Sequence, residues 1–214
     1  MTETTLYLVR HGETEYNRRR IMQGRRIDSS LNETGRRQAR ALARRFSGAS
    51  LDAIYTSALS RSIETAEIVA VHHPDVPRYS LPGLDEMSWG VYEGEKPSDR
   101  LRQMLDRMYA EWDRGNFEHR VEEGESIYDV QERSVAAVDH IVANQRGSTV
   151  LVVAHGRLLR VLLASILDVG LERMNEFDHA NTCVNVVTYR DRRYESSLLN
   201  CTAHLPRVDS VLME

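Results

Sequence analysis

The chain has 214 residues, of which 41% are apolar and 28% are charged, an ordinary composition for a globular protein. Its formal net charge of -4 and the acidic residues interspersed among its arginines argue against a nucleic-acid-binding protein. No apolar run approaches the roughly 20 residues that span a bilayer, and the N-terminus lacks a signal-peptide pattern. We therefore expect a single cytoplasmic domain over residues 1–214 that contacts neither nucleic acid nor membrane.

The first predicted element is a strand over residues 4–9, which ends in Arg10, His11 and Gly12. Apolar runs of this length are typical of strands buried on both faces of a parallel sheet, and such sheets bind ligands at the carboxyl ends of their strands. Gly12 allows a sharp turn and the close approach of a ligand to the main chain. Arginine beside histidine at this place indicates an anion site that contains a nucleophile.

Helices are predicted next from apolar residues at helical spacing. The first follows Thr34, the predicted N-cap, and places four residues on one face, namely Ala39, Leu42, Ala43 and Phe46. A short strand near Tyr55 then passes into a helix whose first turns carry Arg61. This segment is a further piece of the candidate site.

The segment between Glu86 and Gly124 contains a second stripe at helical spacing, made of Leu101, Met104, Leu105, Met108 and Trp112. We interpret this stripe as packing first, with the substrate pocket only at its edges. The pattern Ser126-x-x-Asp129 predicts the start of a further helix.

A second buried strand is predicted over residues 149–154, and it ends in His155 and Gly156. The two strands should therefore deliver His11 and His155 to one rim of a parallel sheet. Two final strands are expected at 183–189 and 194–199, joined by a turn at 190–193.

Four motifs together resemble the histidine phosphatase superfamily, also called the phosphoglycerate mutase-like family. They are Arg10-His11-Gly12-Glu13-Thr14 with Asn17, residues 57–66 with Arg61, Leu84-Asp85-Glu86 followed by residues 90–94, and Ala154-His155-Gly156. The resemblance runs from about residue 4 to residue 205, and Ser30 and Tyr92 depart from the family's usual residues. It implies an α/β fold, a three-layer sandwich with a mostly parallel central sheet and helices on both faces. Residues about 87–125 would form a helical insertion on the substrate side, and a homodimer is one assembly to expect.

The resemblance also implies the roles of particular residues. A phosphomonoester carries about two negative charges, so the attacking group must be neutral and its oxygens need fixed donors. Neighbouring guanidiniums disfavour a second positive charge on an imidazole. The implied catalytic residues are His11, which becomes phosphorylated, together with Arg10, Arg61, Glu86 and His155. The implied substrate-binding residues are Asn17, Gln23, Gly24 and Gly156.

Glu86 is the expected proton donor to the leaving oxygen and later the acceptor of a proton from water. Its acidic neighbours Asp85, Glu93 and Glu95 are the alternatives, but the register of the motif favours Glu86. Glu13 is expected to brace its own loop. The remaining histidines, including His72, His73, His119, His140 and His179, are expected at the surface.

Three classes of function fit these motifs. The first is a phosphatase that hydrolyses a small phosphorylated metabolite without a cofactor or metal, and the second is a phosphoglycerate mutase that depends on 2,3-bisphosphoglycerate. The chain looks short for a mutase, because it lacks the long insertion those enzymes carry between the acid and the second histidine. The third class, a non-catalytic phospholigand-binding module, does not need the whole catalytic set. A metal hydrolase is disfavoured because no metal-ligand spacing exists, and Cys183 and Cys201 are expected to be reduced thiols.

Overall fold

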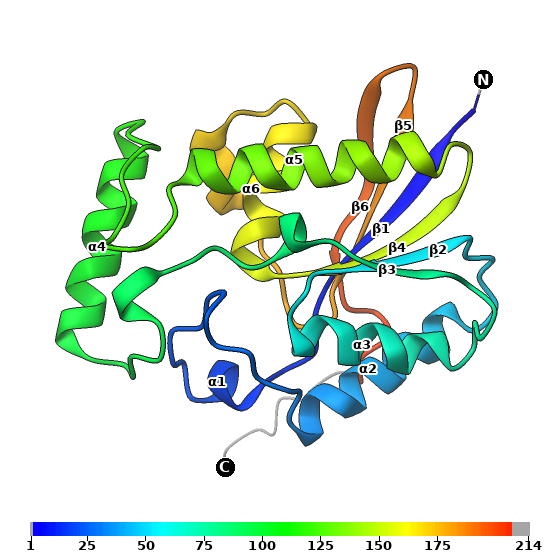
Figure 1. The fold of residues 1–214 in the computed structure, drawn as a ribbon, viewed down its shortest axis with the longest axis horizontal. Helices are drawn as coiled ribbons and strands as arrows, with labels where there is room; N and C mark the ends of the chain where they lie inside the picture. Colours follow the sequence, from blue (N-terminus) through cyan, green and yellow to red (C-terminus); the bar gives the residue numbers. More distant parts are fainter. Residues whose placement is uncertain (1, 207–214) are drawn as a thin grey trace, which may run out of the picture.

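The computed structural model describes residues 2–206, and within them six strands form one sheet (Figure 1). The strand order is β3-β2-β4-β1-β5-β6. The strands are β1 (Thr4–Arg10), β2 (Ala53–Thr56), β3 (Arg78–Ser80), β4 (Thr149–Ala154), β5 (Val184–Arg190) and β6 (Arg193–Cys201). The pairs β3-β2, β2-β4 and β4-β1 are parallel, whereas β1-β5 and β5-β6 are antiparallel. The predicted mostly parallel sheet is confirmed.

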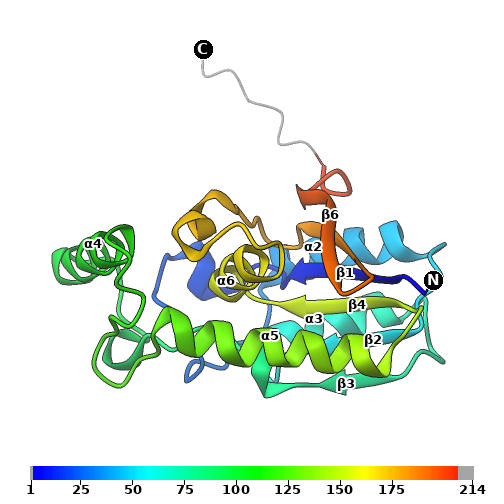
Figure 2. The same ribbon diagram turned by 90° about the horizontal axis from the view of Figure 1, so that it is seen from above.

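Helices cover both faces of this sheet, as predicted. Helices α2 (Glu33–Phe46) and α3 (Ser60–Ala70) lie on one face, and α5 (Ile127–Asn144) and α6 (Gly156–Ile166) lie on the other (Figures 1 and 2). The shorter elements are α1 (Glu15–Arg18) and the 3-10 turns η1 (Pro82–Leu84), η2 (Gly90–Tyr92) and η3 (Leu171–Glu176). No helix within residues 2–206 is long and apolar enough to cross a membrane.

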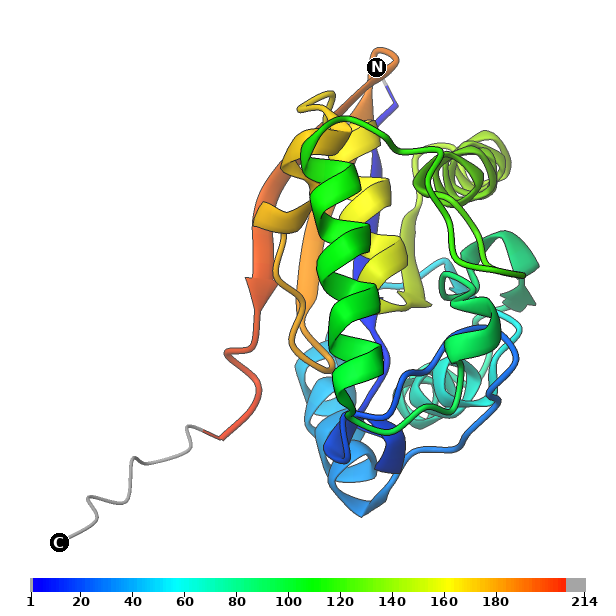
Figure 3. The same ribbon diagram turned by 90° about the vertical axis from the view of Figure 1, so that its left-hand side faces the viewer.

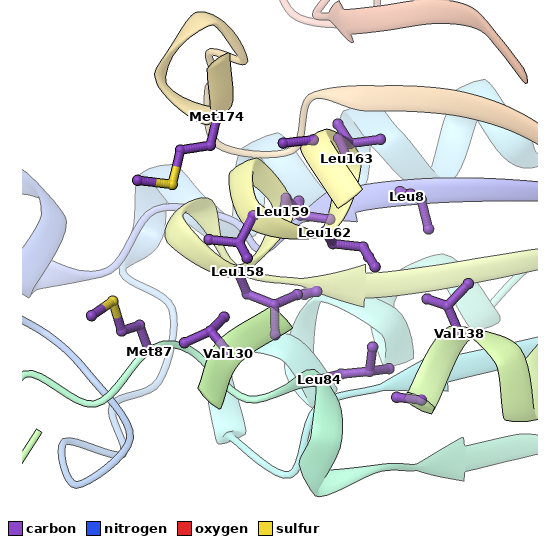
Figure 4. Close-up of a cluster of buried hydrophobic side chains, with 14 of the residues drawn as sticks. Leu8, Leu84, Met87, Val130, Val138, Leu158, Leu159, Leu162, Leu163 and Met174 are labelled. Carbon is purple, nitrogen blue, oxygen red and sulfur yellow. The ribbon is translucent and has the colours of Figure 1, made fainter. Parts of the chain in front are cut away.

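Residues 150–154 of strand β4 are all apolar because both faces of the strand are covered. Val150 and Val152 belong to the cluster under α5 and α6, part of which Figure 4 shows, whereas Leu151 and Val153 belong to the cluster under α2 and α3. Successive side chains of a strand point to opposite faces, so a strand with two covered faces has no polar alternation. The continuous apolar run therefore follows from the three-layer architecture.

Side-chain caps define where several helices begin. Ser126 and Asp129 form the predicted capping box at the start of α5. Helix α2 begins at Glu33, and its N-cap is Asn32, whose Oδ1 accepts a hydrogen bond from the backbone N–H of Gly35 at 2.8 Å. The prediction of Thr34 as the cap was therefore wrong, since Thr34 already lies in the first turn.

Helix α4 (Asp99–Asp113) stands beyond the carboxyl ends of the parallel strands (Figure 2). Figure 3 views the molecule from the side on which α4 lies, and there α4 stands in front of α6. Its buried residues are Leu101, Met104, Met108 and Trp112, so the predicted stripe does pack inward. The substrate-side role predicted for residues 87–125 stays a prediction, and the position of α4 next to the ligand-binding edge supports it.

Candidate active site

The two motif histidines meet at the carboxyl edge of the sheet. Arg10 of β1 pairs with Ala154 of β4 in parallel register, so His11 and His155 leave the sheet at the same level. Their rings lie 5.1 Å apart between centroids, and both side chains are buried. The predicted meeting of the two histidines is confirmed.

The tautomer of His11 follows from its hydrogen bond. Its Nδ1 lies 2.7 Å from the carbonyl oxygen of Gly12, which can only accept, so Nδ1 carries the proton and the lone pair is on Nε2. Burial lowers the pKa of His11 well below its usual value, and the charges of Arg61 and Arg10 lower it further. The sequence analysis attributed the neutral state of His11 to the neighbouring arginines, but burial is the larger cause.

His155 is held in the opposite tautomer. Nε of Arg61 donates to Nδ1 of His155 at 3.2 Å, so the proton of the neutral ring is on Nε2, which lies 2.7 Å from Oγ of Ser57. Burial, followed by the charge of Arg61, also lowers the pKa of His155 well below its usual value. His155 can thus donate to an oxygen through Nε2, whereas His11 can attack through Nε2.

Two arginines flank these rings, the buried Arg61 and the partly buried Arg10. Arg61 is 1% exposed and donates to the carbonyl oxygens of Ile27 (2.9 Å) and Gly24 (3.0 Å), and burial lowers its pKa to about 10. Arg10 donates to the carbonyl of His179 at 2.7 Å, while its buried Nε has no partner within residues 2–206. In that part of the chain, neither arginine forms an ion pair with a carboxylate. Buried cations are normally paired, so the edge is suited to an anionic ligand.

Glu86 lies at the N-terminus of α6. Its carboxylate accepts hydrogen bonds from the backbone N–H groups of Met87 (2.9 Å), Arg157 (3.2 Å) and Leu158 (3.0 Å). Oε1 accepts two of these bonds and Oε2 accepts one, so Oε2 retains a lone pair that could hold a proton. The negative charge of Glu86 also raises the pKa values of Arg10 and Arg61, against the larger effect of burial, which lowers them.

The other acidic candidates are engaged elsewhere. Asp85 accepts from Ala58 N, Glu93 from Arg26 N and Trp89 N, Glu95 from Ser98 Oγ, and Glu13 from Asn32 Nδ2. These carboxylates brace loops. Among the alternatives that the sequence left open, the geometry favours Glu86 as the acid.

Asn17 and Gln23, both predicted to bind substrate, differ in which polar atoms they leave available to a ligand. Oδ1 of Asn17 accepts from Thr14 N (3.1 Å) and from Asn181 Nδ2 (3.4 Å), which leaves its NH₂ group available to a ligand. Gln23 uses both ends inside the protein, because Oε1 accepts from the Thr14 hydroxyl and Nε2 donates to Ser29. In this conformation the side chain of Gln23 holds its loop.

The two predicted glycines lie where the backbone is close to other groups. A Cβ at Gly24 would lie 2.4 Å from the carboxylate of Glu93, and the carbonyl of Gly24 binds Arg61. A Cβ at Gly156 would lie 3.4 Å from Nε of Arg10, a contact that the arginine could accommodate only by a small movement. Gly24 therefore serves the close approach of Glu93, and Gly156 keeps space beside the free nitrogen of Arg10.

Arg133 belongs to the site, but no motif in the sequence pointed to it. Arg133 of α5 donates to the carbonyls of Gly83 (3.0 Å), Asp85 (2.7 Å) and Glu86 (3.1 Å) and pairs with Glu125 at 2.8 Å. It thereby fixes the loop that carries the candidate acid. An arginine on an amphipathic helix has the same pattern as a surface residue, so only a comparison of the helix with its packing partners could have found it.

Two histidines predicted at the surface are buried. His73 is 8% exposed, and its Nε2 lies 3.0 Å from the carbonyl of Phe46. His179 is 7% exposed and bonds through Nδ1 to the carbonyl of Phe177. Both were misassigned because a single histidine in a loop gives no pattern of burial. No group of three or more potential metal-ligating residues occurs within residues 2–206.

Comparisons with known proteins agree with this geometry. The family model of the histidine phosphatase superfamily (branch 1) matches residues 6–202. The chain is 33% identical to "Probable phosphoglycerate mutase GpmB" of Yersinia pestis (strain Pestoides F), over 90% of this chain and 88% of the relative.

Solved structures are similar over nearly the whole chain. YhfR of Bacillus stearothermophilus superposes with a TM-score of 0.85 at 36% identity and covers 94% of this chain and 98% of its own. A phosphoserine phosphatase from Entamoeba histolytica in complex with 3-phosphoglyceric acid superposes with a TM-score of 0.83 at 26% identity, covering 95% and 100%. These relatives support a phosphoryl-transfer enzyme, and the chain belongs to the histidine phosphatase superfamily.

Proposed function

We propose that this protein is a metal-independent phosphatase that hydrolyses a small phosphomonoester metabolite through a phosphohistidine intermediate. The observation that carries the proposal is the state of His11, a buried neutral imidazole whose Nδ1–H is bound to Gly12 and whose Nε2 has no hydrogen-bond partner among residues 2–206. A neutral nucleophile can approach a phosphate dianion without repulsion. The charges of Arg61 and Arg10, which form no ion pair within residues 2–206, also act on this ring and lower its pKa further.

In the first step, Nε2 of His11 attacks phosphorus, and the bond from phosphorus to the ester oxygen breaks. Arg10, Arg61 and the amide of Asn17 donate to the phosphoryl oxygens, and the Nε2–H of His155 joins them by exchanging its bond to Ser57 for one to the ligand. Glu86 delivers a proton from Oε2 to the leaving alkoxide. The free lone pair on Oε2 supports this assignment, because it is the position at which a proton could be held.

In the second step, a water molecule attacks the phosphohistidine, and Glu86 takes one of its protons. The nitrogen–phosphorus bond breaks, inorganic phosphate leaves, and His11 returns to its neutral form. The fixed positive charges of the arginines replace the role that a metal ion has in other phosphatases. The homodimer and the cytoplasmic location stay predictions.

A phosphoglycerate mutase is the second candidate, and the name of the Yersinia relative favours it. A mutase must keep the phosphohistidine away from water while the substrate reorients. The segment between Glu86 and α5 contains a single α-helix, α4. The Yersinia relative matches over 90% of this chain and 88% of its own length, so chain length does not separate the two candidates, and their products must be measured.

The deciding experiment measures two products side by side with purified protein and 3-phosphoglycerate. One assay follows release of inorganic phosphate, and the other follows formation of 2-phosphoglycerate, each with and without 2,3-bisphosphoglycerate as primer. We expect phosphate release that does not need the primer. Primer-dependent isomerisation much faster than phosphate release would overturn the phosphatase proposal and favour the mutase. A panel of phosphomonoesters assayed in parallel would rank the substrates.

A further inference from the structure

The loop between η3 and β5 contacts several groups of the candidate site. Nη1 of Arg10 donates to the carbonyl of His179 at 2.7 Å, and the backbone N–H of Thr182 donates to the carbonyl of Arg10 at 3.0 Å. Between these two loop residues, Nδ2 of Asn181 donates to the carbonyl of His11 at 3.0 Å. The loop therefore holds both Arg10 and His11 at the end of β1.

The peptide group between His11 and Gly12 is held on both of its sides. Its N–H, which belongs to Gly12, donates to Oγ1 of Thr65 at 3.0 Å, and its carbonyl accepts from Asn181. The carbonyl of Gly12 in turn binds Nδ1 of His11 at 2.7 Å. The orientation of this peptide group therefore sets the orientation of the imidazole and the direction of its Nε2.

The amide of Asn181 also reaches Asn17. Nδ2 of Asn181 lies 3.4 Å from Oδ1 of Asn17, and an NH₂ group has two hydrogens, so it can serve both this oxygen and the carbonyl of His11. The backbone N–H of Thr14 can only donate, so the atom of Asn17 that faces it at 3.1 Å is Oδ1. Both contacts fix Oδ1 of Asn17 inside the protein and leave its NH₂ group for the ligand.

The conformation of the loop is enforced by its packing. Thr182 has a φ of +58°, which β-branched residues rarely adopt. Its side chain is fully buried, with Oγ1 3.2 Å from Nε2 of His204, and the backbone N–H of Ala180 donates to Oδ1 of Asn200 at 2.9 Å. Backbone strain of this kind persists where the surrounding structure enforces it, and it is concentrated at functional sites. The loop thus presents Asn181 to the site from a fixed position.

We infer that Asn181 is a positioning residue for phosphoryl transfer, whose NH₂ group holds the nucleophile His11 and the phosphate-binding amide of Asn17 in one arrangement. The inference rests on the proposed transfer through His11 and adds a residue to it. Asn181 acts through its two neighbours. A displaced nucleophile or donor weakens the transition state more than the ground state, so Asn181 should matter most when phosphorus is five-coordinate.

The test compares the binding of orthovanadate and of inorganic phosphate by calorimetry. Vanadate can adopt the five-coordinate geometry of the transition state, whereas phosphate reports ground-state binding. The readout is the Kd for phosphate divided by the Kd for vanadate. We expect the wild type to favour vanadate, and Asn181→Leu, which has a similar shape but no donor, to lower this ratio by about 5 to 50-fold, the range for two neutral hydrogen bonds.

This ratio distinguishes positioning from stability. A smaller fraction of folded protein reduces the number of binding sites and leaves the ratio unchanged. Asn181→Ala should lower the ratio in the same way, which excludes an effect of the bulk of leucine. An unchanged ratio in Asn181→Leu and Asn181→Ala, or a wild type without a preference for vanadate, would overturn the inference.

Asn200→Gly is the matched control, because it removes a hydrogen bond to Ala180 of the same loop without touching His11 or Asn17. Asn200 has a φ of +47°, which glycine adopts readily. This variant should unfold at a lower urea concentration and keep a ratio within about threefold of the wild type. A ratio lowered as much as in Asn181→Leu would assign the effect to the loop as a whole and contradict the role of the Asn181 amide.

A double-mutant cycle tests the route through Asn17. In the Asn17→Ala background one of the two acceptors of Asn181 is gone, so Asn181→Leu should lower the ratio by a smaller factor than it does in the wild type. Equal factors in the two backgrounds would contradict the inference.

These binding measurements also separate the inference from the proposed function. If the wild type releases phosphate from no phosphomonoester, the proposed function fails, while a vanadate preference that depends on Asn181 still supports the inference. If phosphate is released and the vanadate preference survives Asn181→Leu, the proposed function stands and the inference fails.

Discussion

His179 should make the free energy of unfolding of the protein depend on pH. The backbone carbonyl of His179 accepts a hydrogen bond from Arg10. Burial lowers the pKa of the His179 imidazole from 6.5 to about 3, with smaller contributions from the charges of Arg160 and Arg10. Below pH 6.5 the unfolded chain binds a proton at this position, while the native protein does so only near the depressed pKa. Proton binding therefore favours the unfolded chain in this range. The free energy of unfolding is highest above pH 6.5 and falls as the pH drops from 6.5 towards 3.

The size of this effect follows from the linkage relation. For each pH unit between the two pKa values, the free energy of unfolding falls by about 1.4 kcal/mol. A fall to pH 4.5, about two units below 6.5, therefore lowers it by about 2.7 kcal/mol through His179 alone. Asn at this position does not titrate, and its amide can still donate to the carbonyl of Phe177. The drop in the free energy of unfolding between pH 7.5 and 4.5 should therefore be about 2.7 kcal/mol smaller in His179→Asn than in the wild type.

Urea denaturation followed by circular dichroism at both pH values measures this difference. His140→Asn, at an exposed position of α5, is the matched control and should show the same drop as the wild type. The reasoning would be refuted if His179→Asn lost as much stability between the two pH values as the wild type does. Other buried histidines, including His11 and His155, contribute to the total drop, so only the difference between variants reports on His179.

Three further predictions concern the acid, the role of metals and the loop of the nucleophile. Glu86→Gln should reduce hydrolysis of an alkyl phosphate by about 10² to 10⁴-fold and of nitrophenyl phosphate far less, because nitrophenolate leaves without a proton; equal losses would point to another acid. EDTA should leave activity unchanged, since Arg10 and Arg61 supply the positive charge, and a loss restored by magnesium or zinc would contradict this. Gly35→Ala should lower the free energy of unfolding by about 1–3 kcal/mol, because its Cβ would lie 2.1 Å from the Glu13 carbonyl; Gly48→Ala, with open space, is the control, and equal stability of the two variants would argue against the clash.

The sequence predicted those parts of the site that depend on local pattern. The two buried runs end in His11 and His155, and the parallel register of β1 and β4 brings the rings together as expected. The capping box at Ser126 was predicted from the residue types alone. Asn32 and Thr34 were harder to distinguish, because both are good N-caps and stand only two residues apart, so the choice depends on which side chain reaches Gly35.

What the sequence did not predict depends on contacts between distant elements. Arg133 reaches the acid loop from α5 and does not stand out in its own segment. Ser57 opens one of the motifs, but its contact with His155 from the end of β2 was not predicted. Burial is the largest cause of the depressed pKa of His11, and burial is a property of three packed layers. The same reason explains why His179, in a loop after η3, gave no sign of being enclosed.

Trapping of the covalent intermediate tests the central claim most directly. The protein is mixed with ³²P-labelled substrate, quenched rapidly without acid, digested, and the labelled peptide is identified by mass spectrometry. We predict a phosphoryl group on the peptide that contains His11, stable in base and labile in acid, and absent from His11→Ala. A labelled residue other than His11, or turnover of His11→Ala at a rate close to that of the wild type, would contradict the proposed mechanism.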